Sequence, residues 1–188
     1  MTTLLLFHHA LGQTPGFLSL ADELRDAGHT VHAPDLYRGR TFDTLDEGVA
    51  YADEHSLDEV LRWGTAAAEQ LPPDVTYVGF SLGIVPAQHL AQTRPGALGA
   101  VLCYGCVPTA TFERPWPEGV PLQLHIAEDD AWSERDVAEA LAEEVPDAEL
   151  FLYPGSAHLF ADPSAADYDE HAAAQLKHRL LAFLDRLG

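Results

Sequence analysis

Ser81 lies between two glycines, in the segment Gly79-Phe80-Ser81-Leu82-Gly83. The residues before it, Val75 to Val78, are β-branched or aromatic and predict a buried strand, whereas Ile84 to Gln92 contains no glycine and predicts a helix. A Gly-x-Ser-x-Gly segment between a strand and a helix is typical of a nucleophile elbow, in which the glycines leave room for a sharp turn. The turn exposes the serine hydroxyl beside a helix N-terminus, whose free N–H groups favour developing negative charge. We therefore predict that Ser81 is a nucleophile.

A serine nucleophile needs a base, and the base needs a carboxylate that orients it. In hydrolases with this kind of elbow, the acid and then the histidine follow the serine along the chain, each in a loop after a strand. The predicted strand Leu122–Ala127 ends in Glu128-Asp129-Asp130, and the predicted strand Glu149–Tyr153 is followed by a glycine- and serine-containing loop that carries His158. These two loops therefore supply the candidate acid and the candidate base, His158.

The other histidines are less suited to reach Ser81. The sequence has ten histidines. Three lie on predicted helices: His89, His171 and His178. Three more lie near the ends of elements, away from the edge at which the elbow is expected: His29, His32 and His55.

An oxyanion hole requires two backbone N–H groups. One belongs to the residue after the nucleophile, Leu82, and the other to the loop after the first strand, which here spans Phe7 to Gly12. Within that loop we predict Ala10 as the second donor, with Leu11 as the alternative. The adjacent pair His8-His9 could suggest a metal site instead, but no carboxylate or cysteine lies at a useful spacing nearby, so we expect neither a metal nor another cofactor.

Strands and helices alternate along the chain, which predicts an α/β fold with a mostly parallel sheet and helices on both faces. The predicted strands are Thr3–His8, Thr30–Ala33, Val75–Gly79, Ala97–Cys103, Leu122–Ala127 and Glu149–Tyr153. The predicted helices are Gly16–Ala27, Leu57–Gln70, Ile84–Gln92, Glu134–Glu144 and a final helix from about Ala165 to Leu187. The acidic stretch Tyr37–Glu54 is expected to be a loop with a short helix near the carboxyl edge of the sheet, where ligands of such folds bind. No repeat or linker divides residues 1–188, so we expect a single domain.

Composition narrows the class of partner. The 188 residues include thirty Asp and Glu against ten Lys and Arg, which gives a formal net charge of −20. Such a field repels nucleic acid and anionic membrane surfaces. The first apolar run, Leu4–Phe7, is too short for a membrane span and follows no basic residues, and two cysteines are too few for a disulfide scaffold. We therefore expect a cytoplasmic protein that acts on a small molecule, with no nucleic-acid or membrane partner.

Four segments together resemble the dienelactone hydrolase family of α/β-hydrolases. They are Pro34-Asp35-Leu36-Tyr37-Arg38-Gly39, the elbow, Glu128-Asp129-Asp130 and Gly155-Ser156-Ala157-His158-Leu159-Phe160, and they occur in the order of the family. The resemblance implies a compact hydrolase without a large lid, whose nucleophile, acid and histidine fall on Ser81, Asp130 and His158. A shift by one residue would make Asp129 the acid.

Three departures from dienelactone hydrolases proper bear on the mechanism and the substrate. Those enzymes have a cysteine at the position of Ser81, and a glutamate partner for that thiol at the position of His9. Their carboxylate-binding arginine corresponds to Asp162, which would repel a substrate carboxylate. We therefore expect hydrolysis of small, neutral ester, lactone or thioester substrates through an acyl-enzyme; the alternative is an inactive α/β-hydrolase fold that binds small molecules or proteins.

Further residues are expected near the same edge of the sheet. Candidates to line the substrate pocket are His9, Leu11, Tyr37, Tyr104 and Trp132. Cys103-Tyr104-Gly105-Cys106 has the spacing of a redox pair, which would suggest a thiol oxidoreductase. However, it ends a predicted strand and precedes Val107-Pro108 instead of opening a helix, so we interpret its cysteines as buried hydrophobic residues.

Overall fold

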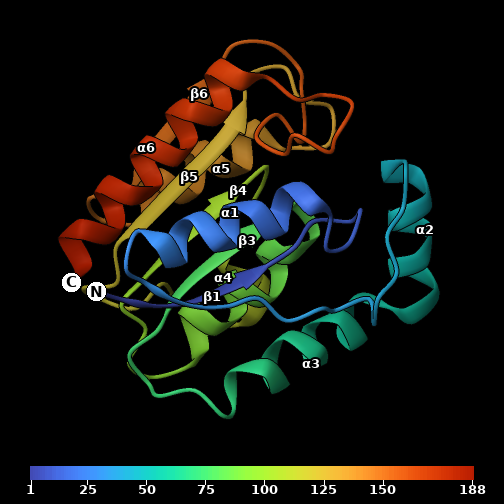
Figure 1. The fold of residues 1–188 in the computed structure, drawn as a ribbon. Helices are drawn as coiled ribbons and strands as arrows, with labels where there is room; N and C mark the ends of the chain where they lie inside the picture. The colour runs from blue at the N-terminus through green and yellow to red at the C-terminus, as the bar shows by residue number, and fades with distance from the viewer.

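The computed structural model describes residues 1–188 and contains one sheet of six parallel strands (Figure 1). The strands lie in the order β2-β1-β3-β4-β5-β6. Their bounds are β1 Thr3–Phe7, β2 Thr30–His32, β3 Thr76–Phe80, β4 Gly99–Cys103, β5 Leu122–Ala127 and β6 Glu149–Tyr153. The predicted α/β fold with a parallel sheet is therefore confirmed, and each predicted strand is present within three residues of its expected bounds.

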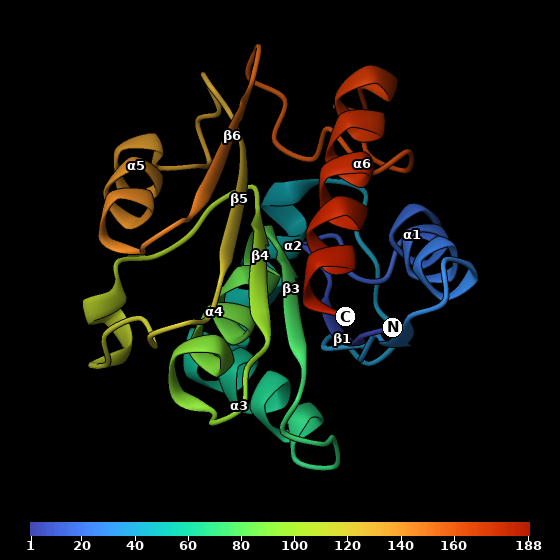
Figure 2. The same cartoon turned by 90° about the vertical axis from the view of Figure 1, so that its left-hand side faces the viewer.

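Helices cover both faces of the sheet, as Figure 2 shows when the sheet is seen nearly edge-on. The helices are α1 Pro15–Asp26, α2 Leu45–His55, α3 Leu57–Ala68, α4 Ile84–Thr93, α5 Arg135–Glu144 and α6 Glu170–Leu187. Helices α1 and α6 pack on one face, where they form a core with Leu4, Leu6 and Val78. Helices α3, α4 and α5 pack on the other face, with Leu5 and Tyr77. Alternate strand residues thus enter opposite cores, as the pleat of a strand requires.

Two helices differ in extent from the sequence prediction. The acidic stretch forms the three-turn helix α2, because Thr44 and Glu47 make a reciprocal capping box at its start. The final helix begins at Glu170 instead of about Ala165, because the side chain of Asp169 accepts hydrogen bonds from the N–H groups of His171 and Ala172.

All six strands run in the same direction, so their carboxyl ends meet at one edge of the sheet. Ser81 follows β3, Asp130 follows β5 by three residues, and His158 follows β6 by five. The parallel topology therefore brings these three residues to the same edge. No helix in the structure is both long enough and apolar enough to span a membrane.

Candidate active site

Ser81 directly follows β3 and is the first residue of the 3₁₀ turn Ser81–Gly83. Its backbone φ is 48°, a left-handed conformation that non-glycine residues seldom adopt. The flanking glycines are required by close contacts. A Cβ on Gly79 would lie 2.6 Å from the Cα of Ile84, and one on Gly83 would lie 2.7 Å from the carbonyl oxygen of His8. The turn thus has the strained backbone and the close packing of a nucleophile elbow.

A chain of two hydrogen bonds links Ser81, His158 and Asp130. The Nδ1 atom of His158 lies 2.6 Å from Oδ2 of Asp130, and its Nε2 atom lies 2.7 Å from Oγ of Ser81. Because the carboxylate only accepts, Nδ1 carries the hydrogen, and Nε2 is left to accept the serine hydroxyl. Both His158 and Asp130 are buried, whereas Ser81 is half-buried and accessible.

Asp130 is held from three sides. Besides His158, it accepts the Trp132 N–H at 2.9 Å and the Ser133 hydroxyl at 2.7 Å. Burial alone would raise the pKa of the Asp130 carboxyl, but the hydrogen bonds from His158 and Ser133 outweigh that effect and lower the pKa. The group is therefore a stable carboxylate that can orient an imidazole.

The neighbouring Asp129 is placed differently. Its side chain is exposed, and its backbone N–H donates to the carbonyl of Gly155 at 3.0 Å. This bond ties the loop after β5 to the loop after β6. Of the two aspartates, only Asp130 contacts His158.

In the loop after β1, the peptide between His9 and Ala10 has a fixed orientation. The His9 carbonyl accepts hydrogen bonds from the N–H of Gly12 at 3.0 Å and from Nδ1 of His8 at 2.8 Å. Since a trans peptide directs its C=O and N–H in opposite directions, the Ala10 N–H points away from these donors. No acceptor in the protein takes the Ala10 N–H, whereas the Leu11 N–H donates to Nδ1 of His9 at 3.3 Å. Of the two predicted donors, Ala10 is thus the one that is free.

His8 connects this loop to the segment before α2. Its Nε2 atom accepts the Leu36 N–H at 3.0 Å, and burial lowers the pKa of the imidazole to about 4. The side chain of Asp35 in turn accepts the N–H groups of Tyr37 and Gly39. The Pro-Asp-Leu-Tyr segment therefore forms a turn that supports the loop after β1.

Comparison with known proteins identifies the family. A sequence model described as the dienelactone hydrolase family matches residues 2–188, which is nearly the whole chain. The chain belongs to the dienelactone hydrolase family. As a member of this family, it is a hydrolase that acts on ester bonds.

Solved structures of relatives share the fold. A dienelactone hydrolase-like promiscuous phosphotriesterase from metagenomic libraries superposes with a TM-score of 0.78 at 21% identity, over 100% of this chain and 87% of the other. The dienelactone hydrolase from Anabaena variabilis gives a TM-score of 0.65 at 19% identity, over 96% and 86%. Esterase 2 from Thermogutta terrifontis, phosphorylated by paraoxon, gives 0.62 at 17% identity, over 100% and 83%. A comparison with curated protein sequences gives no match.

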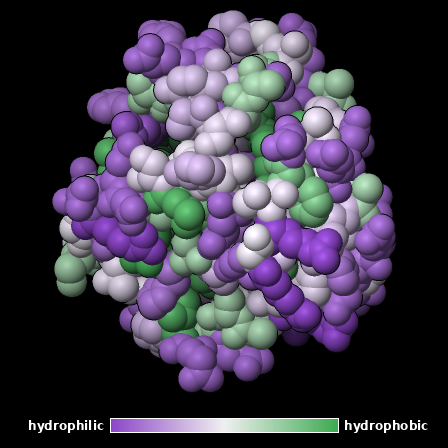
Figure 3. Space-filling view, turned by 45° about the vertical axis from the view of Figure 1, so that its right-hand side comes forward, coloured by the Kyte–Doolittle hydropathy of each residue, from purple (hydrophilic) through white to green (hydrophobic).

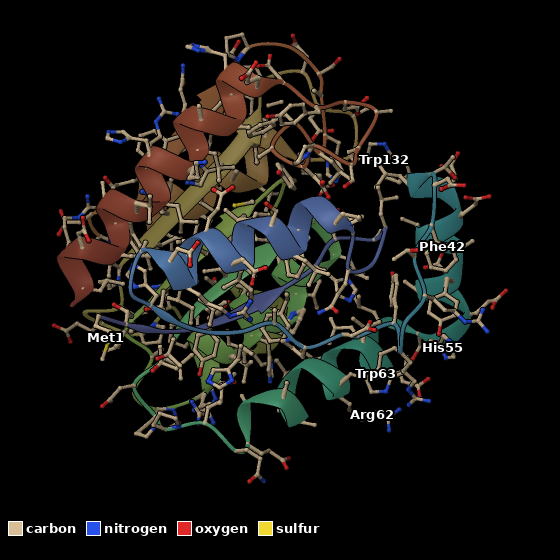
Figure 4. All side chains as sticks on the ribbon, viewed as in Figure 1. Met1, Phe42, His55, Arg62, Trp63 and Trp132 are labelled. Carbon is tan, nitrogen blue, oxygen red and sulfur yellow. The ribbon has the colours of Figure 1, made fainter.

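The residues of this chain that were predicted to line the substrate pocket differ widely in exposure. Tyr37 is completely buried and donates its hydroxyl to the carbonyl of Gly48, so its prediction as a pocket residue is wrong. Leu11 and Tyr104 are also almost fully buried, which leaves them little surface for a substrate. Trp132, in contrast, is 50% exposed, and its ring lies 6.2 Å from that of His158. Figure 4 shows Trp132 at the margin of the molecule, on the same side as α2.

Two of the positions at which the sequence departs from dienelactone hydrolases proper, His9 and Asp162, contact each other. Nε2 of His9 lies 2.6 Å from Oδ2 of Asp162, and both side chains are buried. Asp162 also accepts the Thr14 hydroxyl and the Ser164 N–H, at 2.5 and 2.7 Å. Asp162 therefore presents no exposed carboxylate to a substrate, because its side chain is buried and accepts hydrogen bonds from three donors.

The two cysteines lie in different cores. Cys103 packs under α1 and α6, and Cys106 packs on the opposite face of the sheet. Burial raises the pKa of both thiols, that of Cys106 to about 12. Neither thiol has the lowered pKa of a redox-active cysteine, which disfavours the oxidoreductase alternative. No group of three or more His, Cys, Asp or Glu side chains is arranged to hold a metal ion.

Sequence reasoning missed two polar residues of this region. Ser133 supports Asp130, and Thr14 supports Asp162 while it also caps α1 by accepting the Phe17 N–H. Ser133 lies on the same loop as Asp130, three residues further on, which is the spacing of a local side-chain contact. Thr14 and Asp162 are 148 residues apart, so no local pattern links them.

Proposed function

We propose that the protein is a serine hydrolase that cleaves small, neutral ester substrates, lactones and thioesters included, through an acyl-enzyme intermediate. The observation that carries this proposal is the hydrogen-bonded chain Ser81–His158–Asp130, with links of 2.7 and 2.6 Å at the carboxyl edge of the sheet. Such a chain lets a neutral serine hydroxyl lose its proton as it attacks.

In the first half of the reaction, Oγ of Ser81 attacks the carbonyl carbon of the substrate and its proton moves to Nε2 of His158. The imidazolium that forms is stabilised by the carboxylate of Asp130. The carbonyl oxygen becomes an oxyanion, which accepts hydrogen bonds from the N–H groups of Leu82 and Ala10. When the tetrahedral adduct collapses, the imidazolium protonates the departing oxygen or sulfur atom, which leaves as an alcohol or thiol or, in a lactone, becomes the hydroxyl of the opened ring.

In the second half, a water molecule attacks the acyl group on Ser81. His158 now accepts a proton from the water, and the same N–H groups stabilise the second oxyanion. Collapse returns the proton to Oγ of Ser81 and releases the acid.

The charges around this edge favour a neutral substrate. The two acidic residues that precede Asp130, Glu128 and Asp129, are exposed. The exposed arginines of the segment before α2 are engaged by aromatic rings, since the guanidinium of Arg38 lies 5.2 Å from the centre of the Trp63 ring and that of Arg40 lies 5.1 Å from the Tyr51 ring. In Figure 3, hydrophilic residues dominate the side of the molecule that carries α2, with smaller hydrophobic areas between them. A substrate carboxylate would thus meet repulsion from Glu128 and Asp129.

An alkyl phosphonate ester tests this proposal, because it phosphonylates an activated serine and stops there. We expect one phosphonyl group per chain by intact mass, located on Ser81 by peptide mapping, with loss of esterase activity in proportion to labelling. Ser81→Ala should neither be labelled nor hydrolyse p-nitrophenyl acetate, while Ser133→Ala should still be labelled at Ser81. Labelling at another residue, or activity in folded Ser81→Ala, would contradict the proposal.

A further inference from the structure

We propose that His9 is a positioning residue, which holds the loop after β1 so that the Ala10 N–H faces the substrate oxyanion, and that Asp162 anchors it. This inference rests on the proposed function, since it concerns one of the two oxyanion donors. It assigns a purpose to a buried histidine–aspartate pair that the proton transfers do not use.

The ring of His9 binds two different loops through its two nitrogens. Nε2 donates to Oδ2 of Asp162 at 2.6 Å, and Nδ1 accepts the Leu11 N–H at 3.3 Å. The second bond fixes the tautomer, because a nitrogen that accepts an N–H cannot itself carry hydrogen. His9 therefore acts as a neutral bridge between Asp162 and the peptide that follows Ala10.

Asp162 is an anchor with little freedom to move. One carboxylate oxygen takes the Thr14 hydroxyl as well as His9, and the other takes the Ser164 N–H. Burial opposes ionisation, but the hydrogen bonds from His9 and Thr14 outweigh it, so the pKa of the Asp162 carboxyl lies below its ordinary value. A Cβ on Gly16 would lie 2.9 Å from the carboxylate carbon, so α1 also packs directly against this group.

The remaining contacts of the loop hold its carbonyl groups, not the Leu11 N–H. The Leu11 carbonyl accepts the Phe42 N–H at 3.0 Å, and the Ala10 carbonyl packs against the backbone of Gly48 in α2. Only His9 engages the N–H of Leu11. Without this acceptor, the Leu11 N–H is a second unpaired donor beside that of Ala10. The peptide that joins Ala10 to Leu11 then loses one constraint on its rotation. The His9 carbonyl would still accept the Gly12 N–H and Nδ1 of His8, so the Ala10 N–H would be less tightly aimed but not lost.

Three substitutions separate the two bonds of His9. His9→Gln keeps a side-chain N–H for Asp162 but lacks the acceptor for Leu11, and His9→Asn keeps an acceptor for Leu11 but does not reach Asp162. His9→Ala removes both. The matched control is His125→Asn, because His125 is also fully buried in the sheet, with hydrogen bonds to Tyr153 and Gln123, but lies outside the proposed machinery.

The readout combines p-nitrophenyl acetate kinetics with two ligands. A trifluoromethyl ketone forms a tetrahedral adduct with Ser81 and needs the oxyanion donors, whereas the corresponding non-reactive alcohol binds without them. We expect His9→Ala to lower kcat by at least about tenfold and at most about 10²-fold, the range for one lost oxyanion donor, with KM changed less than about threefold. The affinity for the ketone should fall by the same factor as kcat/KM, and the affinity for the alcohol should stay constant.

Intermediate losses in His9→Gln and His9→Asn, with a smaller loss of kcat in folded His125→Asn, would support the proposal. If His9→Ala does not fold, the two polar variants carry the test. A kcat in the His9 variants equal to that of His125→Asn, or a fall in alcohol binding equal to that in ketone binding, would overturn it. Failure of the proposed function is distinguishable, because it would appear as activity in Ser81→Ala.

Discussion

Two histidine–aspartate pairs lie at the carboxyl edge of the sheet, and they have the same imidazole–carboxylate distance, through Nδ1 in His158 and through Nε2 in His9. In each, an imidazole nitrogen lies 2.6 Å from a carboxylate oxygen, with all four side chains buried. They differ in what the other imidazole nitrogen meets. That of His158 faces the hydroxyl of Ser81, whereas that of His9 faces the backbone N–H of Leu11.

This difference separates proton transfer from positioning. A hydroxyl proton can move to an imidazole when the oxygen attacks a carbon, but a peptide N–H keeps its proton at any ordinary pH. The same pair of side chains therefore suits a catalytic base in one place and a structural bridge in the other. The group beyond the imidazole, not the carboxylate behind it, decides which.

The largest expected effect is in the His158 pair. His158→Ala should lower kcat by on the order of 10³-fold or more, because Ser81 then has no acceptor for its proton. The measurement is kcat for p-nitrophenyl acetate in variants shown by circular dichroism to be folded, with His9→Ala as the comparison. If His9→Ala were the more damaging change, the assignment of the two pairs would be reversed.

The carboxylate of the same pair gives the next effect. Asp130→Asn should lower kcat by about 10²-fold or more, since an amide favours the wrong imidazole tautomer. Asp129→Asn removes a charge from the adjacent exposed residue and should change kcat less than about twofold. The opposite outcome would place the acid one residue earlier in the chain.

The charge of the substrate provides a third test, in which we expect kcat/KM to differ by about tenfold between a neutral and an anionic ester. A neutral acetate ester should have a higher kcat/KM than a carboxylate-bearing ester of equal size, and high salt should narrow the gap because it screens the exposed acids. Asp162→Asn should change the ratio of the two kcat/KM values less than this, because the Asp162 carboxylate is buried and hydrogen-bonded. Replacement of both Glu128 and Asp129 by their amides should bring the ratio of the two kcat/KM values closer to one. A faster anionic ester at low salt would reveal a cation that binds it.

The smallest effect on kcat should come from the loss of Ser133, whose hydroxyl donates to the carboxylate of Asp130. Ser133→Ala removes one hydrogen bond to the carboxylate, which is worth about 1 kcal/mol and should lower kcat by about fivefold. The same variant should also raise the pKa of the Asp130 carboxyl, because one of the hydrogen bonds that favour its ionised form is lost. An unchanged kcat would mean that His158 and the Trp132 N–H hold this carboxylate in place without Ser133.

Much of the fold follows from sequence, because its signals are local. The β-branched runs, the Gly-x-Ser-x-Gly turn and the positions of the loops after β5 and β6 all depend on neighbours in the chain. Parallel topology then implies that Ser81, Asp130 and His158 share an edge, and they lie within hydrogen-bond distance. Their catalytic roles stay predictions until the variants are measured.

The contact between Asp162 and His9 could not be predicted from local sequence signals. A sequence shows that an aspartate lies four residues after His158, but not that its carboxylate points inward to His9, 153 residues away. The prediction that Tyr37 lines the pocket failed for the same reason. The hydroxyl of Tyr37 donates to the backbone of α2, and the acidic composition of that stretch did not predict a helix of this length. Side-chain direction across long sequence separations is a property of the packing.

The two cysteines lie in different cores, so their reactivity can report the local stability of each face of the sheet. Cys103 reports on the core under α1 and α6, and Cys106 on the core across the sheet, and no disulfide joins them. A thiol reagent can reach each one only when its layer opens, so the two alkylation rates under native conditions measure the opening free energies of the two layers separately. Equal rates would indicate that the sheet loses both sets of helices in one cooperative event, and unequal rates would identify the layer that detaches first.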